Sequence, residues 1–461
     1  MEKIINEITE ELKRELIELF CDNPSLGQVE EYVFTKMKAK AVLLTEAYAF
    51  ELNTAIHSDK AGRKKAGMVI ERCRDKRTVL STIGEIHYER DYYHLKNGTY
   101  SYPVDQILEV DNYQRITSRT GVELAREAMK HAYSESSRIV TEGKVSRQTV
   151  MNALRRCEAV PYQEDRLRKV PVLHIDADED HVNLQNGKNR IVPLVSVYEG
   201  IEPVGHIKSK RHRCKNVFHY SESRYHEDFW DNVLIEIRKR YDLEGTKVYL
   251  HGDGAAWIKE GIEHFRDCVY VLDGYHRNKA TKAVFAGVKD DEGIATRMKL
   301  NKALRFGDPR LLGEIRNQRI RENPEYYKRI TEAITYLANN LDGITIRYKD
   351  PEALNGGATE PHVSHVLSSR LSSRPMGWSD KTLKVLVPAL ASGALRLRED
   401  PVQGDHHVAN EVISAAMSMK QRKLPGMRKR PAYVDPENCS RSRVLMNGEV
   451  TPLYRVIHAL S

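Results

Sequence analysis

The chain has 461 residues, of which 40% are hydrophobic and 30% are charged, and its formal net charge is +8. This balance is typical of an ordinary folded protein and excludes a disordered chain. No stretch approaches the roughly 18 apolar residues that cross a bilayer. The charged N-terminal stretch MEKIINEITEELKREL lacks the apolar core of a signal peptide. We therefore expect a cytoplasmic protein of several domains with no membrane association.

The cysteines give no sign of a metal or disulfide framework, because none of them forms a C-x-x-C pair. Their spacing predicts reduced thiols. The six are Cys21, Cys73, Cys157, Cys214, Cys268 and Cys439.

The N-terminal third changes from a helical to a β pattern. Apolar residues at helical spacing predict a helical region over residues 1–76. Residues 77–112 alternate apolar and polar side chains and contain the turn signal Asn97-Gly98. This second stretch predicts a small β segment.

Residues 113–160 return to a helical pattern. One short helix would cover residues 134–142, Gly143 would form a turn, and Ser146 would cap the next helix. A polar helix beginning with Arg147 and Gln148 is typical of a helix-turn-helix, in which these two residues would contact DNA. A plain helical hairpin without DNA contact explains the same pattern.

Residues 168–276 alternate between β and α patterns. The expected order is three successive strands, then helix, strand, helix and strand, which favours an α/β RNase H-like core with a mixed sheet. The strands are expected at 172–184, 191–198, 203–208, 246–250 and 268–272, and the helices at 229–241 and 255–265.

The remaining segments complete and flank this core. Residues 277–350 are helical, rich in Lys, Arg and Glu, and interrupt the α/β pattern as an insertion. Residues 351–395, with a helix over 361–371, would carry the last part of the core. Residues 396–461 form a basic C-terminal region, in which Lys420 to Arg430 contains six Lys or Arg residues and no acid.

Acidic residues recur where the core pattern places strands. Asp176, Asp178 and Asp180 share one face of the first strand, because side chains alternate along a strand. Carboxylates crowded in this way repel one another unless a cation compensates, and their hard oxygen atoms suit Mg²⁺ or Mn²⁺. A solvent-facing acidic turn is the structural alternative for this segment.

Three further acids follow the same principle. Asp253 lies between two glycines at a strand end, Asp273 ends the next strand three residues before His276, and Glu360 begins a late helix. Each has an ordinary structural explanation as a helix cap or strand-end residue. Together they give the arrangement that a two-metal phosphoryl-transfer site needs.

Four segments together resemble the ISLre-two family of bacterial insertion-sequence transposases, within the wider Mutator-like group of DDE transposases. They are LHIDADEDHVNLQ, HGDGAAWIKEG, LDGYHRNKA and GATEPHVSHVLSSRLSSRPMGW. The segments STIGEIHYERDYY and SRQTV are also similar to that family. The resemblance implies an RNase H-like catalytic core, interrupted by a helical insertion, that cuts DNA at the ends of an insertion sequence and joins them to target DNA.

The resemblance also implies roles for particular residues. Asp178, Asp253 and Glu360 would be catalytic and would hold two Mg²⁺ or Mn²⁺ ions, with Asp273 and His276 as a signature near the site. Asp176 remains the alternative for the first Asp. The implied partners are double-stranded DNA, both terminal inverted repeats and target, and further copies of the chain in a homo-oligomer.

A dense run of cations follows the expected third strand. Its members, which would bind DNA phosphates or form a solvated loop, are Lys208, Lys210, Arg211, Arg213 and Lys215. A different class of function stays open: a helix-turn-helix regulator whose acidic strands are purely structural, or an inactive transposase-derived DNA-binding protein. The intact set of acids favours the enzyme.

Overall fold

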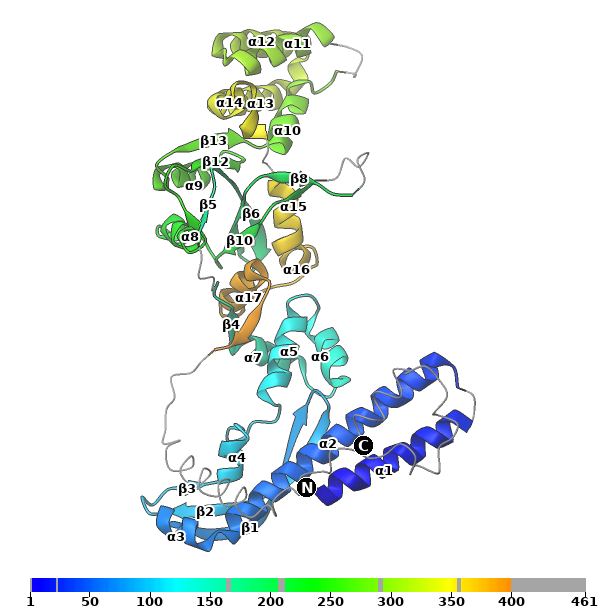
Figure 1. Cartoon of the computed structure of the whole chain (residues 1–461). Helices are drawn as coiled ribbons and strands as arrows, with labels where there is room; N and C mark the ends of the chain where they lie inside the picture. Colours follow the sequence, from blue (N-terminus) through cyan, green and yellow to red (C-terminus); the bar gives the residue numbers. More distant parts are fainter. Residues whose placement is uncertain are drawn as a thin grey trace. The chain divides into compact units, whose positions relative to one another are not determined.

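The computed structural model describes residues 2–21, 24–162, 167–205, 212–288, 293–354 and 358–398 (Figure 1). The basic run at residues 420–430 lies outside them. The chain divides into compact units, one containing Met1–Gly121 and the other formed by Val122–Arg398, and each is described by itself. Among the described residues, no helix is both long and apolar enough to span a membrane.

The first unit is a helical hairpin packed on a β hairpin. Helices α1 (Glu2–Cys21), α2 (Leu26–Ser58) and α3 (Lys60–Ala66) come first, and α2 begins with a capping box made by Ser25 and Gln28. Strands β1 (Met68–Ser81), β2 (Gly84–Leu95) and β3 (Tyr100–Ser101) form an antiparallel sheet in that order, and α4 (Pro103–Ile107) follows.

The predicted boundary between helices and strands, at residue 76, is wrong because β1 begins at Met68. The left-handed Gly67 (φ 66°) ends α3. Most side chains in the first half of β1 are exposed, so that half has no apolar face for the sequence pattern to reveal. The core of this unit lies between α2, the hairpin and α4 and contains Ala49, Leu52, Ile56, Met68, Val79, Ile86, Tyr88, Tyr93 and Val104.

A helical segment connects to the second unit. Helix α5 (Ser118–Ala128) spans the boundary, and α6 (Tyr133–Thr141) and α7 (Arg147–Arg155) follow. Glu142 and Gly143 have left-handed backbones (φ 56° and 81°), and the Ser146 hydroxyl caps α7 by accepting from the Thr149 N–H. The predicted helix, turn and capped second helix are confirmed as structural elements.

The second unit is built on a five-stranded mixed sheet of order β10-β7-β6-β12-β13. Strands β6 (Val172–Asn183), β7 (Asn189–Tyr198) and β10 (Phe218–Ser221) are antiparallel neighbours. Strands β12 (Lys247–Gly252) and β13 (Cys268–Leu272) run parallel to β6. The predicted first, second, fourth and fifth strands are therefore confirmed.

The predicted third strand at residues 203–208 is wrong. Strand β8 (Ile201–Pro203) pairs with β9 (His212–Cys214) in a separate two-stranded sheet, and residues 206–211 lie outside the described residues. The third strand of the main sheet is instead β10. The β8–β9 pair is largely exposed, so its apolar residues do not mark a core strand.

Helices cover both faces of the sheet. Leu173, Ile175 and Ala177 of β6 point into an apolar core with α8 (Phe229–Arg238) and α9 (Ala256–Glu260), which continues as a 3₁₀ turn (Gly261–His264). The expected helices at 229–241 and 255–265 are thus shorter than predicted.

The opposite face of β6 is polar. It meets α15 (Thr359–Val363). That helix continues without a break through a π turn (Ser364–Ser368) into α16 (Ser369–Leu371), so the helix expected over 361–371 is present with a π turn inside it. Helix α17 (Asp380–Ser392) then contacts β10 and β4 (Cys157–Ala159), and β4 pairs with β14 (Leu395–Leu397). Another small parallel pair joins β5 (Arg168–Lys169) to β11 (Tyr241–Asp242).

A helical insertion separates β13 from α15, as the sequence predicts. It consists of α10 (Gly274–Val284), α11 (Ile294–Phe306), α12 (Pro309–Glu322), a 3₁₀ turn (Pro324–Tyr326), α13 (Tyr327–Asn339) and α14 (Leu341–Lys349), before a further 3₁₀ turn (Pro351–Leu354). These helices share an apolar core of their own that reaches Leu272 of β13. The chain returns to the sheet at Asp350, which binds Lys247 Nζ (2.7 Å) and the Tyr249 hydroxyl (2.5 Å).

Candidate active site

Asp178 lies at the centre of the sheet. It is half-buried on the polar face of β6, between β7 and β12. The parallel register places His251 of β12 opposite Asp176. Asp253, two residues beyond His251, therefore lies just past the end of β12 and level with Asp178.

Two glycines bring Asp253 to this position. A Cβ at Gly252 would lie 2.7 Å from the Ile258 side chain and 3.0 Å from the Ala177 carbonyl oxygen, and a Cβ at Gly254 (φ 92°) would lie 2.4 Å from Asn340 Oδ1. The close backbone approach predicted from the sequence is thus confirmed. The Ala255 N–H donates to Asp253 Oδ1 (2.8 Å), so this carboxylate also caps the turn before α9.

The charges of the other two predicted acids act on Asp178. Burial raises the pKa of Asp178 to about 7, although the N–H of Glu179, which donates to Asp178 Oδ1, acts to lower it. The negative charges of Asp253 and Glu360 raise this pKa further, and His276 lowers it. Asp178, Asp253 and Glu360 come from a strand, a strand end and an exposed helix start, yet they lie within electrostatic range.

Asp273 and His276 form a tight pair at the edge of this group. Asp273 is fully buried, caps α10 by accepting from the His276 N–H (2.9 Å), and lies 2.6 Å from the His276 ring through Oδ2 and Nδ1. The bond to Asp273 raises the pKa of His276, and the charges of Asp253 and Asp178 raise it further. A partly exposed, readily protonated ring therefore borders the carboxylates.

Asp176, the alternative first acid, has a different role. It is 2% exposed and accepts hydrogen bonds from the Tyr198 hydroxyl (2.9 Å) and the Ala358 N–H (2.8 Å), and His362 Nδ1 lies 3.3 Å away. Burial alone would raise the pKa of Asp176, but these partners and His251 hold it below its ordinary value. The geometry favours Asp178 as the reactive acid and makes Asp176 the anchor of α15, the helix that carries Glu360.

Asp180 also anchors a helix. Its Oδ1 accepts from the Ser372 hydroxyl (2.8 Å), just beyond α16. The row of three aspartates on β6 is therefore divided among two structural acids and one acid at the candidate site.

Buried histidines, which sequence reasoning missed, complete the polar face. His174 stacks between Tyr198 and Tyr249, with ring centroids 5.5 and 5.3 Å away, and its Nδ1 lies 3.1 Å from His251 Nε2. His174 Nε2 lies 3.5 Å from Glu352, so this carboxylate, which precedes Glu360 in the sequence, belongs to the network.

The histidines are held neutral by burial. Burial lowers the pKa of His251 to about 4, and it lowers the pKa of His219 to about 4 as well. His219 lies edge-on to His362, with ring centroids 5.3 Å apart. No sequence signal marks this cluster, because its members are dispersed along the chain.

The carboxylates suit hard cations in their chemistry. Their oxygen atoms are ligands for Mg²⁺ or Mn²⁺. Burial, and to a lesser extent the charges of Asp253 and Glu360, raise the pKa of Asp178, and a bound cation would favour its charged form. Among the described residues, the carboxylate oxygens of Asp178, Asp253 and Glu360 do not form a group whose atoms all lie within 4.8 Å of one another. This wider spacing is compatible with two ions, which in such sites lie about 3.5–4 Å apart.

The predicted DNA-contact residues of α7 are exposed. Arg147 and Gln148 lie at the start of the helix, and Gln148 Nε2 donates to Asn152 (3.0 Å). Arg147 also lines a hollow of about 310 Å³ together with Arg370 and Trp378.

The dense basic run is described only in part. Lys208, Lys210 and Arg211 lie outside the described residues. Arg213 pairs with Glu202 (2.5 Å) and Lys215 with Glu199 (3.7 Å), so these two cations are partly neutralised within the protein.

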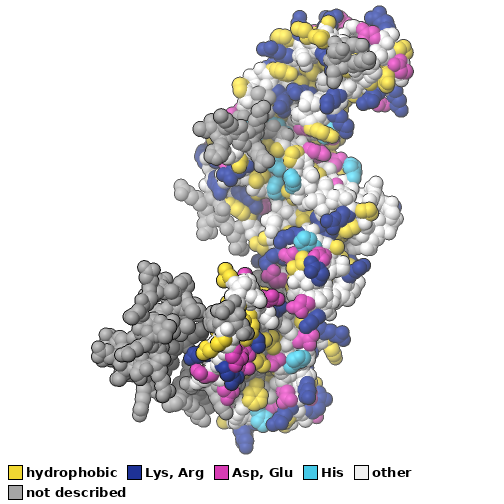
Figure 2. All heavy atoms as spheres, turned by 90° about the vertical axis from the view of Figure 1, so that its right-hand side faces the viewer, with side chains coloured by type: hydrophobic (Ala, Val, Ile, Leu, Met, Phe, Trp, Pro, Cys, Tyr) yellow, Lys and Arg dark blue, Asp and Glu magenta, His cyan; other side chains and the backbone are white. Residues whose placement is uncertain are grey.

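A second basic surface lies on the insertion. Figure 2 shows Lys and Arg side chains gathered over its helices. Helix α11 contributes four cations and no acid, namely Arg297, Lys299, Lys302 and Arg305. Sequence reasoning noted the mixed charge of this segment but did not single out this helix.

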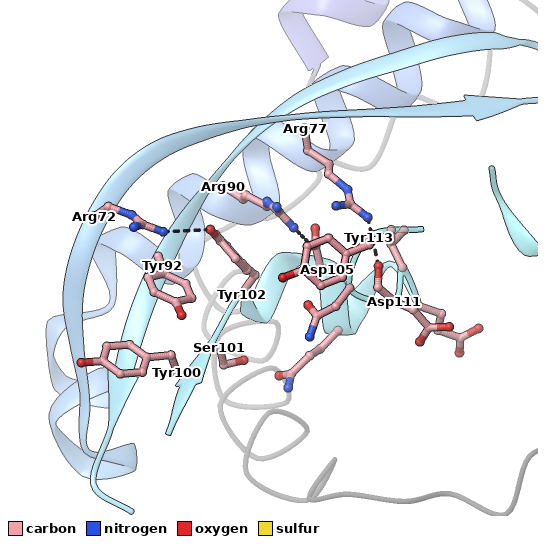
Figure 3. Close-up of a pocket in the computed structure, with 14 residues that line it drawn as sticks. Arg72, Arg77, Arg90, Tyr92, Tyr100, Ser101, Tyr102, Asp105, Asp111 and Tyr113 are labelled. Atoms are coloured by element: carbon pink, nitrogen blue, oxygen red, sulfur yellow. Dashed lines mark hydrogen bonds and ion pairs between the residues drawn. The ribbon is translucent and has the colours of Figure 1, made fainter. Parts of the chain in front are cut away.

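The first unit contains a tyrosine-lined hollow of about 860 Å³ that holds none of the predicted site residues (Figure 3). Arg72 lies over the Tyr92 ring (4.6 Å) and Arg90 over the Tyr102 ring (3.7 Å). Arg90 also pairs with Asp105. The arginines are thus engaged within the fold, and we interpret the hollow as a structural feature of the hairpin.

Comparisons with known proteins agree with a multi-copy bacterial family. Residues 25–397 match the model of an uncharacterised protein family, UPF0236. A UPF0236 protein of Caldanaerobacter subterraneus subsp. tengcongensis is 34% identical over 423 residues, which are 90% of this chain and 87% of the relative. Another from the same organism is 33% identical over 460 residues, 97% and 95% of the two chains. The name of the first joins eleven locus names, and that of the second joins four.

Proposed function

The chain belongs to the UPF0236 family, and we propose that it is a DDE-type DNA transposase, which cuts DNA at the ends of its own mobile element and joins those ends to target DNA. One observation carries the proposal: the charges of Asp253 and Glu360, both far from Asp178 in sequence, act on Asp178 at the polar face of the sheet. Relatives whose names join many loci of one genome support it, since a mobile element leaves copies of itself.

We propose an RNase H-like core for the second unit. Three antiparallel strands followed by two strands parallel to the first, in the order β10-β7-β6-β12-β13, support this assignment. In it the first acid lies on the first strand, the second after the fourth, and the third on a helix after the insertion.

The proposed chemistry assigns a task to each residue. Asp178, between the other two, would hold both metal ions, with Asp253 and Glu360 holding one each. Bound Mg²⁺ or Mn²⁺ would supply activation of water or of a DNA 3′-OH and stabilisation of charge on the phosphate. His276, protonated through its bond to Asp273, is placed to donate a hydrogen bond to a phosphate oxygen.

The proposed partners are double-stranded DNA and other copies of the chain. Exposed Arg147 and Gln148 would contact the terminal repeats, and the cations of α11 would contact the DNA backbone. A transposase must hold two element ends together, so we propose a homo-oligomer that acts on DNA in the bacterial cytoplasm.

The test is Mg²⁺-dependent nicking of duplex oligonucleotides taken from the DNA that flanks the reading frame. Asp178→Asn, Asp253→Asn and Glu360→Gln should each abolish nicking while DNA binding persists, and the triple variant should be no less active than the worst single variant. Glu352→Gln is the matched control, because Glu352 is a nearby carboxylate in the histidine network. Nicking by Glu360→Gln at the wild-type rate would place the third ligand elsewhere.

A DNA-binding regulator is the second candidate, favoured by the capped α7 with Arg147 and Gln148 exposed. Chelation separates the two functions. A regulator would bind its DNA equally well in EDTA and would show no nicking in Mg²⁺.

A further inference from the structure

A second set of possible metal ligands lies in the first unit. His57 at the end of α2, Cys73 on β1 and Asp91 on β2 each offer an atom, and these three atoms all lie within 4.8 Å of one another. No other group of three His, Cys, Asp or Glu side chains among the described residues has ligand atoms this close together. None of the predicted site residues belongs to it.

A β-bulge creates the arrangement. Arg72 pairs with Tyr92 and Asp75 pairs with Arg90, so Cys73 and Arg74 together face Asp91. Arg74 has a left-handed backbone (φ 60°), which turns its N–H onto Asp91 Oδ1 (3.0 Å). A strand of ordinary pairing would not bring the Cys73 thiol and this N–H to the same carboxylate.

Asp91 is held in place by its neighbours. It is 1% exposed, its own N–H donates to Asn53 Oδ1 (2.9 Å), and its Oδ2 lies 2.7 Å from His57 Nδ1. The carboxylate is therefore fixed between the end of α2 and the bulge on β1.

A buried hydroxyl beside the cluster provides an independent sign of a missing group. Tyr93 is fully buried, and its hydroxyl has no hydrogen-bond partner among the described residues. Tyr93 follows Asp91 by two residues on β2, so both side chains lie on the same face of the strand. A buried hydroxyl left without a partner costs free energy unless a bound group or water satisfies it.

We propose that His57, Cys73 and Asp91 bind a borderline transition-metal cation of the Zn²⁺ type. One nitrogen, one sulfur and one oxygen ligand suit Zn²⁺, whose charge a thiolate and a carboxylate would neutralise. Tetrahedral coordination separates ligand atoms by about 3–4 Å, so small side-chain movements would close the present spacing. His57 and Cys73 are exposed, which leaves the ion accessible and its fourth position open to water, with the Tyr93 hydroxyl nearby as a partner.

The site has a structural role and does not rest on the proposed transposase function. Its ligands join the last turn of α2 to both strands of the hairpin. Bound metal would therefore stabilise the first unit without entering any reaction at Asp178. Mg²⁺ would not replace it, because a thiolate is a poor ligand for that hard cation.

The experiment uses the full chain, stripped of metal and kept reduced, and titrates it with Co²⁺ as a spectroscopic substitute for Zn²⁺. We expect one equivalent to produce the near-ultraviolet absorption of a cobalt–thiolate bond and Zn²⁺ to abolish it by competition. Cys73→Ser should lose this absorption and His57→Gln should weaken Co²⁺ binding at least tenfold. Both residues are exposed, and circular dichroism checks that each metal-free variant is folded.

Cys21→Ser is the matched control, since Cys21 is an exposed thiol on α1. It should behave as wild type. A folded wild-type chain that gives no cobalt–thiolate absorption would overturn the proposal, and so would absorption that survives in Cys73→Ser. The same titration of Asp178→Asn should be unchanged, which separates this site from the carboxylates of the proposed active site.

Discussion

Replacing Asp178 by Asn is expected to stabilise the metal-free protein. Burial raises the pKa of Asp178 from the ordinary value of 3.8 to about 7, so the folded chain binds a proton that the unfolded chain has already released between these pH values. Above pH 7 the charged carboxylate therefore costs stability, with an upper limit of about 4 kcal/mol. Solvent reaches this half-buried group, and we expect a realised gain on the order of 1–2 kcal/mol.

The same substitution two residues earlier should have the opposite effect. Asp176 accepts from Tyr198 and Ala358 and faces His362, and an amide would turn a donor toward one of these donors. Asp176→Asn should lower the free energy of unfolding by about 1–3 kcal/mol. The pair is a matched comparison, because both changes remove one charge from the same face of β6.

Thermal melting at pH 8 in EDTA measures both effects, and each kcal/mol corresponds to a shift of about 2–4 °C. Mg²⁺ should raise the melting temperature of the wild type and not that of Asp178→Asn, which should also fail to nick DNA. Equal destabilisation by both substitutions would refute the assignment of Asp178 as an uncompensated acid. A nicking-active Asp178→Asn beside an inactive Asp176→Asn would move the first metal ligand to Asp176.

Three further predictions concern pH and DNA. Burial lowers the pKa of His219 and of His251 to about 4, so the unfolded chain binds more protons than the folded chain below pH 6.5. The free energy of unfolding should therefore fall as pH drops from 6.5 to 4, by up to about 3 kcal/mol for each histidine. Denaturant titration of Asp178→Asn measures this fall without the opposite contribution of Asp178. Arg147→Ala should reduce the preference for terminal-repeat over random DNA by ~1–3 kcal/mol in competition binding. Arg138→Ala, which replaces an exposed arginine on α6, is the control and should leave this preference unchanged. Replacing Lys299 and Lys302 by Ala should weaken binding to any duplex and reduce the log–log salt slope by about 1 per lost phosphate contact, and an unchanged slope would remove α11 from the DNA surface.

The parts of the fold that the sequence predicts are those with a local signal. Strands β6, β12 and β13 alternate or concentrate apolar residues over their whole length, and their predicted limits lie within two residues of the structure. Ser146 marks the start of α7 through a side-chain cap, which is also a local interaction. The glycines around Asp253 signal a close backbone approach for the same reason.

The parts that could not be predicted depend on contacts between distant residues. Strand β10 has only four residues, and its pairing with β7 is what makes it the third strand of the sheet. A buried neutral histidine cannot be distinguished in sequence from an exposed one, so the contact of His174 with His251, 77 residues away, gave no signal. The sequence leaves open which of Asp176 and Asp178 is the first acid of the site, because both share one strand face. Only the partners around each carboxylate distinguish them.

The polar face of β6 shows how one strand can carry two carboxylates with different tasks. Asp176 is surrounded by donors, which lower its pKa and make it a fixed acceptor for the start of α15. Burial raises the pKa of Asp178, and the charges of Asp253 and Glu360 raise it further, while the N–H of Glu179 only partly offsets them. Because α15 carries Glu360, Asp176 helps to determine where Glu360 lies relative to Asp178. The site therefore depends on a helix that is held by a charged residue and not by apolar packing alone.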